Sequence, residues 1–285
     1  MIPLKAQNSS PPCTRRQPWE DIARIADAHT LRVQRWLSSR APNAVTFDGL
    51  GTRVASTGLK IRLLNQALGA HYPPDTSPEA IHTEIKRLKT FFAQRGVGGW
   101  YWWLGPFSTR AHLPDLLKTH GLEYDGIGLP CMVALLPPIH HPPIPPDITV
   151  WRAKTLADLQ SASTIRRIAF KFPDGEALTY FDDMPEDWLG DRSPAQLFLA
   201  RAGKGEPATI GALILAEGVP GVYVMATLPK WGRRGLGAAI LARIMDEATR
   251  QGHQMIVLTA SKLGHGLYRK FGFEHIFDYA IFKHP

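Results

Sequence analysis

The proline-rich segment PPIHHPPIPPD, at residues 137–147, constrains the fold of this chain more than any other feature. Its prolines remove backbone hydrogen-bond donors and favour an extended, semi-rigid connector. His140 and His141 within it have no further ligand at useful spacing, so we expect them to be solvated. We therefore predict two domains, at residues 1–137 and 148–285, joined by a linker over residues 138–147.

The amino-terminal part is predicted to contain helices and short strands. Apolar spacing indicates helices over residues 18–40 and 78–95, and a third helix that Ser108 or Thr109 caps and Gly121 ends. Short strands are expected at 44–47, 52–56, 61–64 and 131–136. The dense aromatic strand at 100–104, Trp-Tyr-Trp-Trp-Leu, is expected to be buried between layers rather than to stack a ligand.

The carboxy-terminal part is predicted to be a run of strands interrupted by helices. Strands are expected at 148–152, 196–202, 209–216, 221–228, 255–260 and 277–282. Helices are expected at 156–170, 236–251 and 264–270, and residues 171–194 form a polar segment rich in acids. Strands in a run, followed by a helix and a crossing strand, indicate a mixed α/β sheet.

Composition narrows the classes of function. The formal charge is +8, which suits a polyanion or a phosphorylated small molecule. Lysine and arginine are spread along the chain, so nucleic-acid binding is not favoured. Cys13 and Cys131 lie too far apart to form a disulfide framework, and no metal-ligand spacing is present. No stretch is apolar enough for a membrane helix or a signal peptide, so we predict a cytoplasmic protein without a metal.

A glycine turn, Gly232-Arg233-Arg234-Gly235-Leu236-Gly237, separates a predicted strand from a predicted helix. In a strand, turn and helix that follow in this order, several backbone N–H groups and the positive end of the helix point at one spot. A phosphate is the natural occupant of that spot. The spacing lacks the Lys-Ser or Lys-Thr pair of a Walker loop and the glycine order of a dinucleotide loop. The alternative is a tight connection that binds nothing.

A second motif follows one helix and one strand later. It consists of a small-residue loop that contains Ser261 and of Leu267-Tyr268-Arg269-Lys270-Phe271-Gly272-Phe273. Together with Thr227-Leu228-Pro229 and the glycine turn, it resembles the acetyl-CoA signature and the Leu-Tyr-x-x-x-Gly-Phe element of the GNAT acetyltransferase superfamily. The resemblance covers residues 148–285 and implies an α/β (α+β) fold with the mixed central sheet of that superfamily.

The resemblance also implies a site and a reaction. Acetyl-CoA would be the co-substrate, Tyr268 would protonate the departing thiolate, and the acetyl group would pass by direct attack to an amine of a small molecule or peptide. The implied contacts of acetyl-CoA are Met225, Ala226, Thr227, Arg233, Arg234, Gly235, Leu236, Gly237, Ala238 and Ser261. The alternative is an acyl-CoA-binding or regulatory protein without catalysis.

Two features depart from the family pattern. Gly232 stands where the signature usually has Arg or Gln, and Arg233 and Arg234 can supply the missing charge. The strand that leads into the turn carries no acid where many such enzymes have a glutamate base. Candidates for the base are therefore sought elsewhere: Glu176, Asp182, Asp183 and Glu217, with His265 as a possible assistant to Tyr268.

The amino-terminal part carries a second resemblance to the same family. Trp102-Trp103-Leu104-Gly105-Pro106, then a helix, His120-Gly121-Leu122 and a strand at Met132 look like the degenerate first half of tandem GNAT proteins. No glycine turn of the right pattern precedes these residues. We expect residues 1–137 to form a GNAT-like domain without its own acetyl-CoA.

Overall fold

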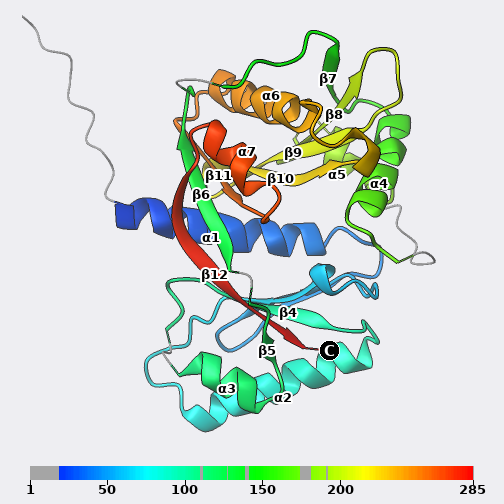
Figure 1. Ribbon diagram of the computed structural model, residues 1–285. Helices are drawn as coiled ribbons and strands as arrows, with labels where there is room; N and C mark the ends of the chain where they lie inside the picture. The colour runs from blue at the N-terminus through cyan, green and yellow to red at the C-terminus, as the bar shows by residue number, and fades with distance from the viewer. Residues whose placement is uncertain are drawn as a thin grey trace, which may run out of the picture.

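One mixed sheet runs through both halves of the molecule in the computed structural model (Figure 1). The structure describes residues 19–109, 112–126, 128–138, 141–173, 181–190 and 192–284. Within them the strand order is β1-β2-β3-β4-β12-β6-β11-β10-β9-β8-β7, with β5 paired to β12. The predicted α/β fold with a mixed central sheet is confirmed.

The amino-terminal half is built from three helices and the first six strands among the described residues. In chain order they are α1 (Trp19–Ser38), β1 (Val45–Asp48), β2 (Arg53–Ser56), the 3-10 turn η1 (Arg62–Leu64), β3 (Asn65–Leu68), α2 (Pro78–Gln94), β4 (Trp100–Leu104), α3 (Leu113–Thr119), β5 (Glu123–Tyr124) and β6 (Leu129–Leu135). Helix α2 begins where its sequence favours a start, because the Ser77 side chain accepts a hydrogen bond from Ala80 N and Pro78 needs no acceptor.

The carboxy-terminal half also contains both strands and helices. Its elements are β7 (Ile148–Arg152), α4 (Leu156–Ala169), α5 (Glu186–Leu189), β8 (Ala195–Ala202), β9 (Thr209–Ala216), β10 (Val219–Thr227), the 3-10 turn η2 (Pro229–Trp231), α6 (Leu236–Arg250), β11 (Met255–Thr259), α7 (His265–Lys270) and β12 (Glu274–His284). A capping box between Thr155 and Asp158 starts α4.

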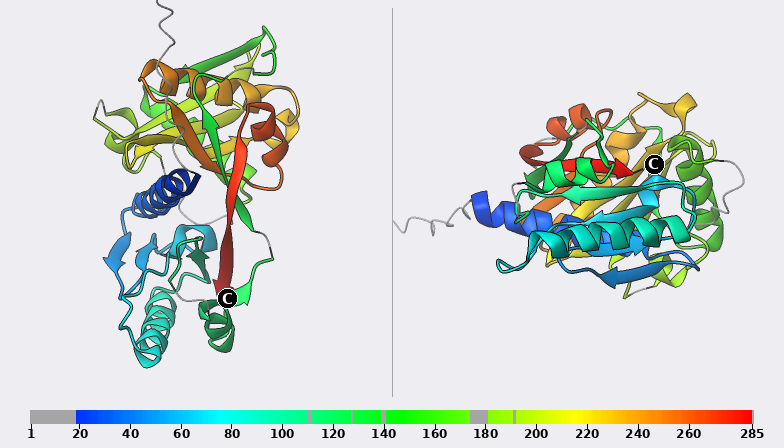
Figure 2. Two further views of the ribbon diagram at one scale, coloured as in Figure 1. Left: turned by 90° about the vertical axis from the view of Figure 1, so that its left-hand side faces the viewer. Right: turned by 90° about the horizontal axis from the view of Figure 1, so that it is seen from below.

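The helices cover the sheet in layers. Residues of α6 and α7 share one core cluster with the carboxy-terminal strands, and α4 and α5 pack on the opposite face. Helices α2 and α3 cover the outer face of the amino-terminal strands. Helix α1 lies between the two halves and contacts strands of both (Figures 1 and 2). Helix α1 therefore packs against both halves of the molecule.

The aromatic strand β4 is buried, as predicted. Trp100, Trp102 and Trp103 are each at most 2% exposed. The Trp102 indole donates a hydrogen bond to the Gly69 carbonyl at 2.9 Å, which satisfies the one polar atom of that ring.

The strand predicted at residues 61–64 is wrong. Residues Arg62–Leu64 form a 3-10 turn, and β3 begins only at Asn65. The Asn65 side-chain amide donates to the carbonyls of Leu59 and Ile61, each at 2.9 Å, and so holds the chain in a turn.

The predicted cap of the third helix is also wrong. Helix α3 begins at Leu113, and neither Ser108 nor Thr109 caps it. The Thr109 hydroxyl instead accepts a hydrogen bond from Tyr72 N at 2.9 Å and donates to the Ala70 carbonyl at 3.0 Å. This side chain ties the loop after β4 to the loop after β3.

The two halves exchange strands. Strand β6, which belongs in sequence to the amino-terminal half, pairs with β11 on one side and with the first part of β12 on the other. The last part of β12, residues 280–284, pairs with β4 of the amino-terminal half. Each half of the sheet is therefore completed by a strand from the other, and the division at residues 138–147 stays a prediction about domains.

Candidate functional site

Strands β10 and β11 separate in the middle of the sheet. They are parallel and paired only where residues 221–222 meet residues 257–258. Strand β10 then bulges, with Val224 in the left-handed region at φ 53°, and resumes pairing with β9 at Ala226. The edge of residues 223–227 that faces β11 therefore leaves the ladder, and a wedge lined by backbone donors and acceptors opens there.

The glycine turn lies at the open end of this wedge. Arg233 and Gly235 are both left-handed, at φ 60° and 88°, and Gly235 is the N-cap of α6. Ala239 is the first residue after the turn whose amide has a backbone acceptor, the Gly235 carbonyl at 2.9 Å. Among the described residues, the amides of residues 233–238 have no backbone acceptor. Such a group of amides at a helix start attracts an anion.

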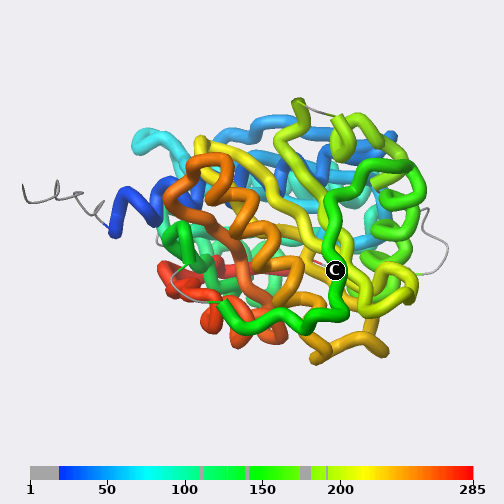
Figure 3. Tube along the Cα trace, turned by 90° about the horizontal axis from the view of Figure 1, so that it is seen from above, coloured from blue at the N-terminus to red at the C-terminus, as the bar shows by residue number. Residues whose placement is uncertain are grey.

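Two of the glycines leave space that a side chain would fill. A β-carbon at Gly235 would lie 2.9 Å from Pro145 Cδ, so the linker packs directly on the turn (Figure 3). A β-carbon at Gly237 would point between Leu267 Cδ2 at 3.6 Å and Thr227 Oγ1 at 4.0 Å. Gly237 therefore faces the gap between α7 and the end of β10.

Gly232 is the position that departs from the expected signature, and its backbone does not require a glycine. Gly232 has φ −59° and ψ 149°, which any residue adopts, and its amide donates to the Pro229 carbonyl at 3.2 Å. The loss of Arg or Gln at this position therefore removes a side chain without changing the backbone. Arg233 and Arg234 are exposed beside it, and the Arg234 guanidinium lies over the Trp231 ring, 4.9 Å from its centroid.

Tyr268 stands on the same face of the sheet as the glycine turn. Its side chain is 7% exposed and packs in the core cluster of α6 and α7, against Phe273. Burial raises the pKa of Tyr268 to about 12, so the phenol keeps its proton at neutral pH. A β-carbon at Gly264 would lie 2.7 Å from Tyr268 Cε2, so this glycine leaves room for the ring.

Ser261 shapes the loop before α7. Its hydroxyl accepts a hydrogen bond from Gly264 N at 3.2 Å, and its carbonyl accepts from His265 N at 3.0 Å. The loop leads into α7, and Leu267 brings this helix against the start of α6, since a β-carbon at Gly237 would lie 3.6 Å from Leu267 Cδ2. The helix that bears Tyr268 therefore packs beside the glycine turn.

Comparison with known proteins bears on this arrangement. Residues 193–275 match the model of a family described as acetyltransferase (GNAT) domain. A GCN5-related N-acetyltransferase from Kribbella flavida is similar over 92% of this chain and 95% of its own, with a TM-score of 0.66 and 20% identity. The fold is the GNAT fold.

Two further solved GNAT structures extend over nearly the whole chain. The GCN5-related N-acetyltransferase from Sphaerobacter thermophilus is 16% identical, with a TM-score of 0.62, over 92% of this chain and 91% of its own. A tandem GNAT protein from the clavulanic acid biosynthesis pathway is 11% identical, with a TM-score of 0.60, over 93% and 94%. A search of curated protein sequences found no match.

The predicted base candidates lie on different elements of the chain. Glu217 lies at the turn that precedes β10, at the opposite end of that strand from Thr227, with its carboxylate 3.8 Å from Arg32. Asp182 accepts a hydrogen bond from the Ser163 hydroxyl of α4 at 2.7 Å. Glu176 lies outside the described residues. His265 is the first residue of α7.

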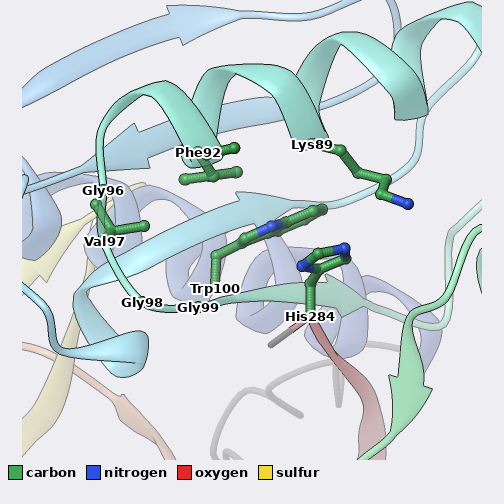
Figure 4. Close-up of a pocket in the computed structure, with 9 residues that line it drawn as sticks. Lys89, Phe92, Gly96, Val97, Gly98, Gly99, Trp100 and His284 are labelled. Carbon is green, nitrogen blue, oxygen red and sulfur yellow. The ribbon is translucent and has the colours of Figure 1, made fainter.

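Other features of the surface lie apart from the wedge. A hollow of about 240 Å³ in the amino-terminal half is lined by Lys89, residues 96–99 and the parallel stack of Phe92, Trp100 and His284 (Figure 4). Within the described ranges, no group of three or more His, Cys, Asp or Glu is arranged to hold a metal ion. None of the helices described has the length and hydropathy that crossing a bilayer requires.

Sequence reasoning missed two side chains of this region. Pro145 and Trp231 pack around the turn, yet in sequence they belong to the linker and to a loop. The family motif located the glycines and Tyr268. Only the folded chain shows that the linker forms one wall of the turn.

Proposed function

We propose that the protein is an N-acetyltransferase that moves the acetyl group of acetyl-CoA to an amine of a small molecule or peptide. The observation that carries the proposal is the row of free amides at residues 233–238, which lies at the end of the β10 edge that leaves the ladder and beside α7, the helix that bears Tyr268. The match of residues 193–275 to the GNAT domain supports it.

The residues around the wedge fit acetyl-CoA as co-substrate. The amides of the turn and the positive end of α6 would hold the pyrophosphate, and the exposed Arg233 and Arg234 add positive charge beside it. Backbone groups of Met225 and Thr227, on the edge that left the ladder, would hold the pantetheine arm. The thioester supplies the activated acetyl group.

Tyr268 would act as the general acid. Its raised pKa keeps the proton on the phenol until a thiolate forms nearby, and a positioned donor of this kind typically accelerates a reaction 100-fold or more, in order of magnitude. The buried surroundings of the ring fix its orientation.

We further propose that the amino-terminal half is a GNAT-like domain that binds no acetyl-CoA. Its parallel strands β3 and β4 do not part, because Gly69 N continues the ladder by donating to the Trp103 carbonyl at 2.9 Å. The start of α2 is already occupied by the Ser77 cap and by Pro78, which has no N–H. Among the described residues, β3, β4 and the start of α2 therefore offer no wedge and no row of free amides like that of residues 233–238.

Calorimetric titration with acetyl-CoA and a thiol-release assay test the two parts of the proposal. We expect one molecule of acetyl-CoA per chain, and thiol release with at least one member of a panel of amines, amino acids and aminoglycosides. Absence of acetyl-CoA binding would refute the proposal. Two molecules per chain would contradict the account of the amino-terminal half.

Two substitutions separate binding from catalysis. Gly237→Val extends a side chain into the gap between Leu267 and Thr227, so we expect at least a tenfold loss of acetyl-CoA affinity. Gly266→Ala is the matched control, because nothing lies within 4 Å of a β-carbon there. Tyr268→Phe should bind acetyl-CoA normally and turn over about 100-fold more slowly. Unchanged turnover would remove Tyr268 from the mechanism.

Binding without catalysis is the second candidate function. It is favoured by Gly232, which lacks the usual side chain of the signature, and by the absence of an acid on β10 between residues 223 and 227. Tight acetyl-CoA binding, with no thiol release across the whole amine panel, would support this candidate over the first.

A further inference from the structure

Two threonines face each other across strands β9 and β10. Thr227 is the last residue of β10 and pairs with Thr209, the first residue of β9. Their hydroxyl oxygens form a hydrogen bond of 3.1 Å. Thr209 is fully buried, whereas Thr227 is only partly buried. The pair therefore connects the core to the end of the strand that leads into the glycine turn.

The bulge in β10 determines which face of the sheet the Thr227 side chain occupies. Tyr223, before the bulge, and Ala226, after it, both belong to the core cluster on the α4 face. In a regular strand, two side chains three positions apart point to opposite faces. The extra residue of the bulge therefore reverses the alternation. Thr227, the next residue, consequently points to the other face, which carries α6 and Tyr268.

The Thr227 hydroxyl lies beside the free amides of the glycine turn. A β-carbon at Gly237 would lie 4.0 Å from Thr227 Oγ1. Gly237 belongs to the row of residues 233–238, whose amides have no backbone acceptor among the described residues. Strand β10 therefore adds a side-chain hydroxyl to one end of this row.

Burial determines the direction of the hydrogen bond between the two threonines. Each hydroxyl carries one proton and can also accept one. Within the described ranges, Thr227 Oγ1 is the only hydrogen-bond partner of the Thr209 hydroxyl, and a buried proton without an acceptor is costly. Thr209 therefore donates and Thr227 accepts. The proton of Thr227 is left for a second partner on the partly open side beside Gly237.

The charge around this proton favours an anionic partner. Residues 218–245, which include β10, the glycine turn and most of α6, contain no Asp or Glu. Their charged residues are all basic: Lys230, Arg233, Arg234 and Arg243. A hydrogen bond to a charged acceptor is about twice as strong as one between neutral groups. An oxygen of an anion is therefore the favoured acceptor for the Thr227 proton.

We propose that Thr227 donates a hydrogen bond to the phosphate that carries the pantetheine arm of acetyl-CoA, and that Thr209 positions the hydroxyl for it. The inference rests on the proposed binding of acetyl-CoA. The Thr227 backbone lies on the edge proposed to hold the arm, and its hydroxyl lies beside the amides proposed to hold the pyrophosphate. The phosphate that carries the arm is the group of acetyl-CoA at that junction.

Calorimetric titration with acetyl-CoA tests the role of Thr227. Thr227→Val keeps the branched shape of the side chain without its proton, so the Kd should rise about tenfold, as expected for a lost hydrogen bond to a charged group. Thr227→Ser keeps the hydroxyl and should bind like the wild type. Thr249→Val is the matched control, because it makes the same change near the other end of α6, where the hydroxyl donates to the Met245 carbonyl.

The role of Thr209 is tested by its coupling to Thr227. Thr209→Val leaves the Thr227 hydroxyl free to rotate, so the Kd should rise about threefold. The same substitution should cause no further loss in Thr227→Val, where no proton remains to be directed. Thr209→Ser should restore the affinity. An equal effect of Thr209→Val in both backgrounds would overturn the positioning role.

Phosphorus NMR of bound coenzyme A identifies the group that Thr227 contacts. Thr227→Val should move a resonance of the pyrophosphate and leave the 3′-phosphate resonance in place. An unchanged Kd in Thr227→Val, or pyrophosphate resonances that do not move, overturns the assignment of Thr227 and leaves acetyl-CoA binding intact. No binding of acetyl-CoA by the wild type overturns the proposed function and this inference together.

Discussion

Gly235→Ala should destabilise the protein by more than its backbone conformation alone explains. An L-residue in the left-handed region costs about 1–2 kcal/mol. The β-carbon would also lie 2.9 Å from Pro145 Cδ and 3.0 Å from Pro145 Cγ, closer than real contacts allow. Overpacking of this kind costs about 1–3 kcal/mol. We therefore expect a total loss of about 2–5 kcal/mol in the free energy of unfolding, from adding these two ranges.

The other end of the same helix provides the control. Gly252 follows α6 with φ 85°, nearly the φ of 88° at Gly235, and nothing lies within 4 Å of a β-carbon there. Gly252→Ala should therefore show the conformational cost alone, about 1–2 kcal/mol. The difference between the two variants isolates the contact between the linker and the turn.

Urea unfolding, followed by circular dichroism, measures both losses. A double-mutant cycle with Pro145→Ala then tests the cause, because the smaller side chain should restore about 1 kcal/mol or more to Gly235→Ala and nothing to Gly252→Ala. Equal losses in the two glycine variants, or no coupling to Pro145, would show that the linker does not pack on the turn.

Three further outcomes are expected. Stability should fall as pH drops from 6.5 to about 4, because burial lowers the pKa of His29 to about 4, so the folded state binds fewer protons there than the unfolded chain. The loss should reach about 3 kcal/mol, and an unaltered pH slope in His29→Phe would contradict it. Thr209→Val removes the hydrogen bond of 3.1 Å to the Thr227 hydroxyl and should cost about 1 kcal/mol in urea unfolding, with no change counting against that bond. Deletion of residues 280–285 should expose the amides of β4 to hydrogen exchange while those of α6 stay protected, and continued protection of β4 would argue against the pairing with β12.

Local patterns in the sequence predicted most of the elements that hold the candidate site. The glycines of the turn and the apolar stripe of α6 express short-range preferences of the chain, and the family resemblance singled out the segment that carries Tyr268. Helix α5 was not predicted, because its short run is held mainly by the burial of Trp188 against Phe181. A single buried aromatic in a polar segment has no periodicity to detect.

Strand pairing over long distances could not be predicted in the same way. Strand β6 is a nearly continuous apolar run and β12 mixes apolar and polar residues, but neither pattern says which neighbour a strand chooses. The same limit applies to Asp27, which reads as an ordinary polar position on a helix until Tyr279 and Gly105 close around it. Contacts between residues so far apart in sequence depend on the completed fold.

The exchanged strands also determine the order in which the strands can pair while the chain is being translated. The chain emerges from its amino-terminal end, so β4 is available long before residues 280–284, which pair with it. Until then the edge of β4 opposite β3 has no permanent partner, although β6 can join β11 as soon as β11 has been made. Nascent chains should therefore acquire a complete carboxy-terminal sheet and a complete amino-terminal sheet almost together, once β12 has been made.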